Sequence, residues 1–188
     1  GMPGMPGMMG KGAGRRPSAQ AAPHVISTGT QVCVRDLEKA QEHNGKLGKI
    51  TGWDERKGRY EVELTDGDAQ TLSLRPGNLT QVCSVEVTGI ESQPELNGQA
   101  GTVLNYKTKE GRYSVRLRTK VNGRDVVGIQ PSNVILSTGT RVVVNGLSNE
   151  QFNGQMAVIK DFDRSAMRYT VECQSGKSIK IKLDNILC

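Results

Sequence analysis

Short runs of alternating apolar and polar residues cover most of the chain from position 28 onward. In a β-strand, side chains two positions apart lie on the same face, so this alternation predicts strands with one buried face. No stretch shows sustained helical periodicity. The pattern therefore predicts an all-β protein. The clearest alternating sets are Val32/Val34, Val85/Val87, Val142/Val144, Tyr60/Val62/Leu64, Tyr113/Val115/Leu117 and Tyr169/Val171/Cys173.

These strands belong to three copies of one sequence pattern. Each copy has an Asn-Gly pair, and a tyrosine follows the asparagine after sixteen residues: 44 to 60, 97 to 113 and 153 to 169. Arg-Tyr is preceded by glycine in the first two copies and by Met167 in the third, which predicts a longer or differently shaped turn there. Because the tyrosines share a face with apolar neighbours, we predict that they are core residues: Tyr60, Tyr113 and Tyr169.

Turn residues divide each copy into five short strands, which is the pattern of a small barrel. Asn-Gly supplies the positive φ angles of a tight turn, and a closing Pro-x-Asn predicts a short helical turn before the last strand. The predicted units are a disordered, basic, Gly/Pro/Met-rich tail (1–27) and three barrels (28–80, 81–136 and 137–188). A unit of this size alone buries only about 60% of its unfolded surface. We therefore expect the barrels to pack on one another.

The repeated unit resembles a Src-homology-3-like (SH3-like) five-stranded small barrel, in the group that includes KOW and Tudor modules. Asn-Gly-x-x-Gly-x-Val followed by Gly-Arg-Tyr-x-Val-x-Leu is similar to tandem repeats of protist and algal proteins. The resemblance covers residues 28–188 and implies a fold more than a function, since small barrels serve many functions. It implies no peptide groove paved with aromatics and no aromatic cage, because only one tyrosine per repeat falls on the matching strand.

Few residues have the chemistry of a catalytic or metal site. The four cysteines form no C-x-x-C pair, and we expect them to be free thiols. The two histidines have no recurring partner for acid–base work, so we expect neither an enzyme nor a metal or cofactor site. Gly176-Lys177-Ser178 lacks the glycine five residues earlier that a phosphate-binding loop needs, and we interpret it as a hairpin turn.

Net charge is +6, and the excess lies outside the first barrel. The tail has three basic residues and no acid, so it is either a flexible leader or a short arm that contacts phosphate. The second and third barrels each carry seven basic and five acidic residues. These basic faces are either solvated surfaces that prevent edge pairing or a footprint for a phosphate backbone. The candidate nucleic-acid-binding residues are Arg112, Arg116, Arg118, Lys107, Lys109, Lys120, Arg124, Lys177, Lys180 and Lys182.

Two functions from different classes remain open at this point. The first is a non-catalytic scaffold that presents tandem barrels to protein partners. The second is an RNA- or DNA-binding protein that uses the basic faces of the last two barrels. Aromatics are only 4% of the chain, and the net charge is modest, which favours the first. The sequence contains no apolar run of membrane-spanning length and no apolar leader at its start, so we expect an intracellular protein, cytoplasmic or nuclear.

Overall fold

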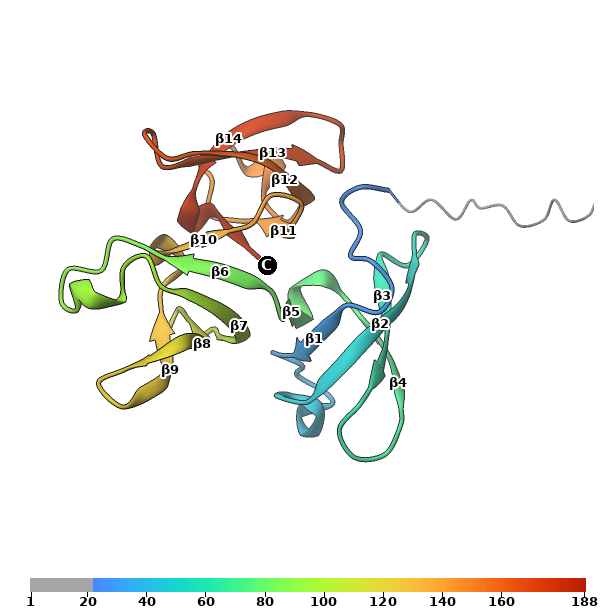
Figure 1. The fold of residues 1–188 in the computed structure, drawn as a ribbon. Coiled ribbons are helices and arrows are strands. Elements are labelled where there is room, and N and C mark those ends of the chain that lie inside the picture. Colours follow the sequence, from blue (N-terminus) through green and yellow to red (C-terminus); the bar gives the residue numbers. More distant parts are fainter. Residues whose placement is uncertain (1–21) are drawn as a thin grey trace, which may run out of the picture.

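The computed structural model describes residues 22–188, which form three five-stranded antiparallel sheets and six short 3-10 turns. The all-β prediction and the three small barrels are confirmed. The basic part of the predicted tail, with Lys11, Arg15 and Arg16, lies outside the described residues. Figure 1 shows the barrels grouped around a centre, where the chain ends at Cys188.

The three barrels have the same strand order. In each, the first strand pairs with both the second and the fifth, the second with the third, and the third with the fourth. Barrel 1 contains β1 (Gln31–Val34), β2 (Leu47–Asp54), β3 (Arg59–Leu64), β4 (Thr71–Leu74), β5 (Leu79–Gln81), η3 (Gln41–His43) and η4 (Pro76–Asn78). Barrel 2 contains β6 (Ser84–Val87), β7 (Ala100–Lys107), β8 (Arg112–Val121), β9 (Arg124–Ile129), β10 (Val134–Leu136), η5 (Pro94–Leu96) and η6 (Pro131–Asn133). Barrel 3 contains β11 (Arg141–Val144), β12 (Met156–Asp163), β13 (Arg168–Cys173), β14 (Ser178–Lys182), β15 (Ile186–Leu187), η7 (Glu150–Phe152) and η8 (Leu183–Asn185).

The turn between the second and third strands is the same in all three barrels, which corrects the expectation for Met167. Met167 has a φ of 52°, close to the 65° of Gly58 and Gly111. Its left-handed conformation is uncommon for a side chain with a Cβ. The Asp163 carboxylate holds this turn by accepting hydrogen bonds from the backbone N–H groups of Ser165 and Ala166. The Asp54 carboxylate accepts the two equivalent bonds in barrel 1, so the turn keeps its shape with either glycine or methionine at this position.

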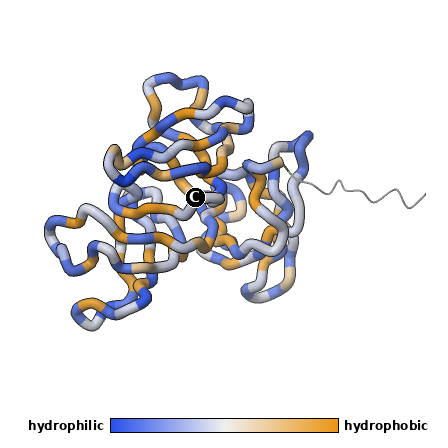
Figure 2. The backbone as a smooth tube through the Cα atoms, turned by 45° about the horizontal axis from the view of Figure 1, so that its top comes forward, coloured by the Kyte–Doolittle hydropathy of each residue, from blue (hydrophilic) through white to orange (hydrophobic). Residues whose placement is uncertain are grey.

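The three tyrosines predicted as core residues are buried, each with 1% of its surface exposed. Figure 2 shows hydrophobic residues toward the inside of the barrels, with hydrophilic stretches at the outer turns. One core cluster is continuous through barrels 2 and 3. The core of barrel 1 includes one residue of barrel 3, Met156. The prediction that the barrels pack on one another is therefore confirmed.

Each tyrosine hydroxyl also accepts a hydrogen bond from a backbone N–H at the end of a neighbouring segment. Leu136 N, at the end of barrel 2, donates to Tyr169 of barrel 3 at 2.7 Å. Reciprocally, Cys188 N, at the end of barrel 3, donates to Tyr113 of barrel 2 at 3.2 Å. These two reciprocal hydrogen bonds therefore connect barrels 2 and 3 through equivalent strand ends. Hydrogen bonds of this kind satisfy amides that would otherwise be buried without partners.

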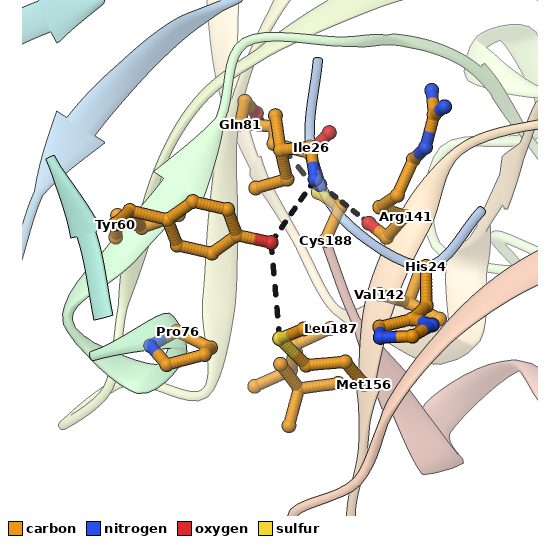
Figure 3. Close-up of a pocket in the computed structure, with 12 residues that line it drawn as sticks. His24, Ile26, Tyr60, Pro76, Gln81, Arg141, Val142, Met156, Leu187 and Cys188 are labelled. Atoms are coloured by element: carbon orange, nitrogen blue, oxygen red, sulfur yellow. Dashed lines mark hydrogen bonds between the residues drawn. The ribbon is translucent and has the colours of Figure 1, made fainter. Parts of the chain in front are cut away.

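Tyr60 of barrel 1 has a different donor, drawn in Figure 3. Ile26 N donates to its hydroxyl at 3.0 Å, and the hydroxyl lies 3.8 Å from Met156 Sδ. Burial raises the pKa of Tyr60 to about 12, so the phenol is protonated at neutral pH. Val25 and Ile26 are 3% and 6% exposed. These two residues fall within the range 1–27 assigned to the tail by sequence, yet they pack against barrel 1, because their apolar side chains are buried there.

Candidate binding groove between the first two barrels

The ten basic residues singled out from the sequence are all exposed. Those of barrel 2 lie at the end of β7, in the turn after it, on β8 and at the start of β9. In barrel 3, Lys180 and Lys182 lie on the edge strand β14, and Lys177 lies in the turn before it. Figure 1 shows β9 and β14 on opposite sides of the molecule. The fold therefore spreads the basic residues of barrel 2 along β8, with Lys107 and Lys109 near one end and Lys120 and Arg124 at the other, and Lys177, Lys180 and Lys182 belong to a different barrel.

Within the barrel 2 group, the three arginines of β8 have different environments. The guanidinium of Arg112 donates to the carbonyl of Gly128 on β9 at 3.3 Å. The equivalent Arg59 of barrel 1 donates to Ser73 O at 3.0 Å, so this is a repeated structural contact. Arg116 and Arg118 make no ion pair with a described residue. Of the three, these last two are more available to a partner.

Arg116 lies on the rim of a groove between barrels 1 and 2. The groove has a volume of about 560 Å³, within the range typical of ligand-binding pockets. Barrel 1 contributes β1, β2 and the turn after β3, and barrel 2 contributes β7, β8 and β9. The linker residue Val82 joins the two sides. The groove residues are Gln31, Cys33, Gly45, Leu47, Asp66, Val82, Thr102, Leu104, Asn105, Ser114, Arg116 and Val126.

The groove has a mixed apolar and charged lining. Leu47, Val82 and Leu104 are half-buried, and Val126 is 42% exposed, the most exposed large apolar side chain among residues 22–188. Val126 on β9 is the direct cross-strand partner of Arg116 on β8. This places a cation next to an exposed apolar side chain at the mouth of the groove.

On the opposite wall, Asp66 forms a hydrogen bond within barrel 1. Its carboxylate accepts a hydrogen bond from Leu47 N at 2.8 Å. The pKa of Cys33 is raised mainly by burial and, to a smaller extent, by the negative charge of Asp66. Asp66 is therefore occupied in holding the turn after β3 against β2. The charge left without a partner at the groove is the positive one of Arg116.

A cluster around Arg35 fixes the two walls relative to each other. Its guanidinium lies 5.2 Å from the ring centre of Tyr106 in barrel 2 and pairs with Asp36 at 2.6 Å. The Asp36 carboxylate in turn accepts a hydrogen bond from the Thr108 hydroxyl of barrel 2 at 2.5 Å. Arg35 also donates to Thr80 Oγ1 at 2.9 Å. Because these contacts tie barrel 1 to barrel 2, the groove between them has a set width.

Each barrel has a second aromatic residue that the strand alternation did not indicate, and in barrel 2 it is the Tyr106 that Arg35 contacts. Its signal was the interval of seven residues before each core tyrosine: 53 to 60, 106 to 113 and 162 to 169. The ring centres are 4.6 Å apart for Trp53 and Tyr60, 5.2 Å for Tyr106 and Tyr113, and 5.1 Å for Phe162 and Tyr169. The earlier aromatic is half-buried each time. In barrel 2 it faces Arg35 of barrel 1, and in barrel 3 it lines a hollow beside Glu86 of barrel 2.

The other sequence motifs have structural roles. Gly176 has a φ of 91° in the turn between β13 and β14, and β14 begins at Ser178, so the hairpin interpretation is confirmed. The four cysteines are free thiols. Within residues 22–188, no three metal-ligating side chains lie together, and no helix has the length and apolarity needed to span a membrane.

The groove combines half-buried apolar side chains, one exposed valine and one guanidinium without an ion-pair partner among the described residues, on two walls joined by the contacts of Arg35. In comparisons with known proteins, no family model and no curated protein matched this chain.

Proposed function

We propose that this chain is a non-catalytic binding protein, and that the groove between barrels 1 and 2 takes an extended segment of a protein partner. The observation that supports this most is the pairing of exposed Val126 with Arg116 at the mouth of the groove. Val126 lines the same groove as the half-buried Leu47, Val82 and Leu104, and apolar surface rimmed by polar residues is typical of interaction sites. The free thiols are consistent with a reducing intracellular compartment, and we place the protein in the cytoplasm or nucleus.

The charge at the groove defines the partner further. Arg116 has no acidic partner among the described residues, and Arg118 and Lys120 continue the basic surface along β8. A complementary segment carries one or two acidic residues for Arg116 and its neighbours, next to an apolar side chain for Val126 and Leu104. Opposite charges across an interface raise the association rate and set the register.

This proposal is tested by selecting peptides from a random display library on the intact protein in the presence of nuclease. We expect the enriched peptides to share an apolar residue next to an acidic one. Their affinity should fall about tenfold or more on Arg116→Glu, because the substitution places like charges together. The matched control is Lys182→Glu, the same charge reversal on β14, far from the groove, and it should leave the affinity unchanged. Enriched peptides that bind both variants equally would contradict the proposed site.

Nucleic acid is the second candidate partner, supported by the exposure of all ten basic residues. Here the fold favours barrel 2 as the contact, since β14 lies on the other side of the molecule (Figure 1). If this function holds, replacing both Arg116 and Arg118 by glutamate should weaken binding to all sequences. The slope of log K against log salt concentration should flatten by about two units. No retention of the wild type on RNA or DNA at about 50 mM salt, where such contacts are strongest, would remove this candidate.

A further inference from the structure

Two of the four cysteines lie in contact at the centre of the molecule, although 105 residues separate them. Cys83 belongs to the linker between β5 and β6, and Cys188 directly follows β15. Their sulfur atoms are 3.4 Å apart, with Cys83 as the donor. Cys83 is partly exposed, whereas Cys188 is 5% exposed. This contact joins the end of barrel 3 to the linker between barrels 1 and 2.

The surroundings make the two sulfurs chemically different. The sulfur of Cys188 accepts a hydrogen bond from the S–H group of Cys83. This hydrogen bond is the main reason that the pKa of Cys188 lies below its usual value, and the Tyr113 hydroxyl adds to the effect. Donating this hydrogen bond raises the pKa of Cys83, and burial raises it further. A thiolate, and not a thiol, is the nucleophile in cysteine oxidation. The hydrogen bond therefore favours the thiolate on Cys188, with a second thiol in contact with it.

We propose that Cys83 and Cys188 are a redox-active pair that closes to a disulfide on exposure to a peroxide. The Cys188 thiolate attacks one peroxide oxygen, the O–O bond breaks, and the leaving hydroxide takes up a proton to become water. Cys188 is then a sulfenic acid. The sulfur of Cys83 attacks the Cys188 sulfur, the S–O bond breaks, and the hydroxide leaves as water with the Cys83 proton. Two thiols are oxidised and one peroxide is reduced to two waters.

The fold permits the small movements that this chemistry needs. A disulfide has sulfurs about 2.05 Å apart, so the two atoms must approach by about 1.4 Å. Strand β15 has only two residues, Ile186–Leu187, and an element with so few backbone hydrogen bonds opens locally more readily than the longer strands. Such opening admits a peroxide to Cys188, and redocking through the hydrogen bond from Cys188 N to Tyr113 returns the sulfur to Cys83.

The other two cysteines are internal controls. Cys33 lies on β1 and Cys173 on β13, both are buried, and the only sulfur–sulfur contact among the described residues is that of Cys83 with Cys188. Burial raises the pKa of both Cys33 and Cys173. Their thiolate fractions are therefore small, and neither has a resolving partner. We expect both to stay reduced under conditions that oxidise the pair.

The test treats the reduced, full-length chain with hydrogen peroxide, followed by alkylation in denaturant and peptide mass spectrometry. We expect a peptide pair linked through Cys83 and Cys188, with Cys33 and Cys173 alkylated. The double variant Cys33→Ser/Cys173→Ser should form the link as the wild type does, and Cys83→Ser should leave a sulfenic acid on Cys188 that a dimedone probe captures. Links that involve Cys33 or Cys173, dimers between chains, or no oxidation of Cys188 would each overturn the proposal. This test does not depend on the binding groove.

Discussion

Replacing Tyr113 by alanine should lower the free energy of unfolding by about 3–5 kcal/mol. The ring is 1% exposed, and it packs edge-on against Tyr106 at 5.2 Å between centres. Its hydroxyl also accepts the backbone N–H of Cys188. The substitution leaves a cavity in the core that barrels 2 and 3 share, and it leaves a buried amide without a partner. Urea unfolding followed by far-ultraviolet circular dichroism measures the loss.

Tyr113→Phe is the matched control for this experiment. Phenylalanine keeps the ring in place and removes only the acceptor for Cys188 N, which should cost about 1–3 kcal/mol. A loss below about 1 kcal/mol for Tyr113→Ala would be incompatible with a core ring, since large-to-small substitutions of buried aromatics cost several times more.

Met156→Ala should destabilise barrel 1, although Met156 belongs to barrel 3. Its side chain is 4% exposed and lies in the core of barrel 1, with Sδ at 3.8 Å from the Tyr60 hydroxyl (Figure 3). Truncating a buried methionine costs about 2–5 kcal/mol. The single tryptophan, Trp53, packs against Tyr60 in barrel 1 and reports on that barrel alone. We expect the midpoint of the tryptophan fluorescence transition to move to lower urea concentration.

Met156→Leu should keep most of the stability, at a cost below about 1.5 kcal/mol, because the volume is nearly conserved. If Met156→Ala shifted the circular dichroism transition but left the Trp53 fluorescence transition in place, barrel 1 would be independent of barrel 3. That result would contradict a junction held by Met156.

The interior of each barrel could be predicted from sequence, because the alternation is local. Val62 and Leu64 fix the phase of Tyr60, and the same spacing repeats twice, so the buried face of every third strand was identified correctly. The turn at Met167 was not predicted, because the methionine adopts the left-handed conformation that glycine has in the other two barrels. The left-handed conformation at that position favours glycine but does not require it.

The contacts between barrels could not be predicted, because they depend on how whole units are oriented. Nothing near Cys83 or Cys188 in the sequence indicates that their sulfurs lie 3.4 Å apart. The groove has the same origin, since Val126 and Val82 line one groove only when barrel 2 is placed against the linker. Likewise, the sequence grouped the lysines of β14 with the arginines of β8 as one basic set, whereas in the fold these strands belong to different barrels, with β14 at the top of Figure 1 and β8 at its lower left.

The central claim is that the groove between barrels 1 and 2 binds a protein segment, and one titration tests it most directly. The intact chain, labelled with nitrogen-15, is titrated with one of the acidic peptides enriched by display, and the backbone amide shifts are followed. We expect the largest shifts at Val82, Leu104, Arg116 and Val126, and none on β14. Shifts centred on β14, or on any surface that excludes Arg116 and Val126, would contradict the claim.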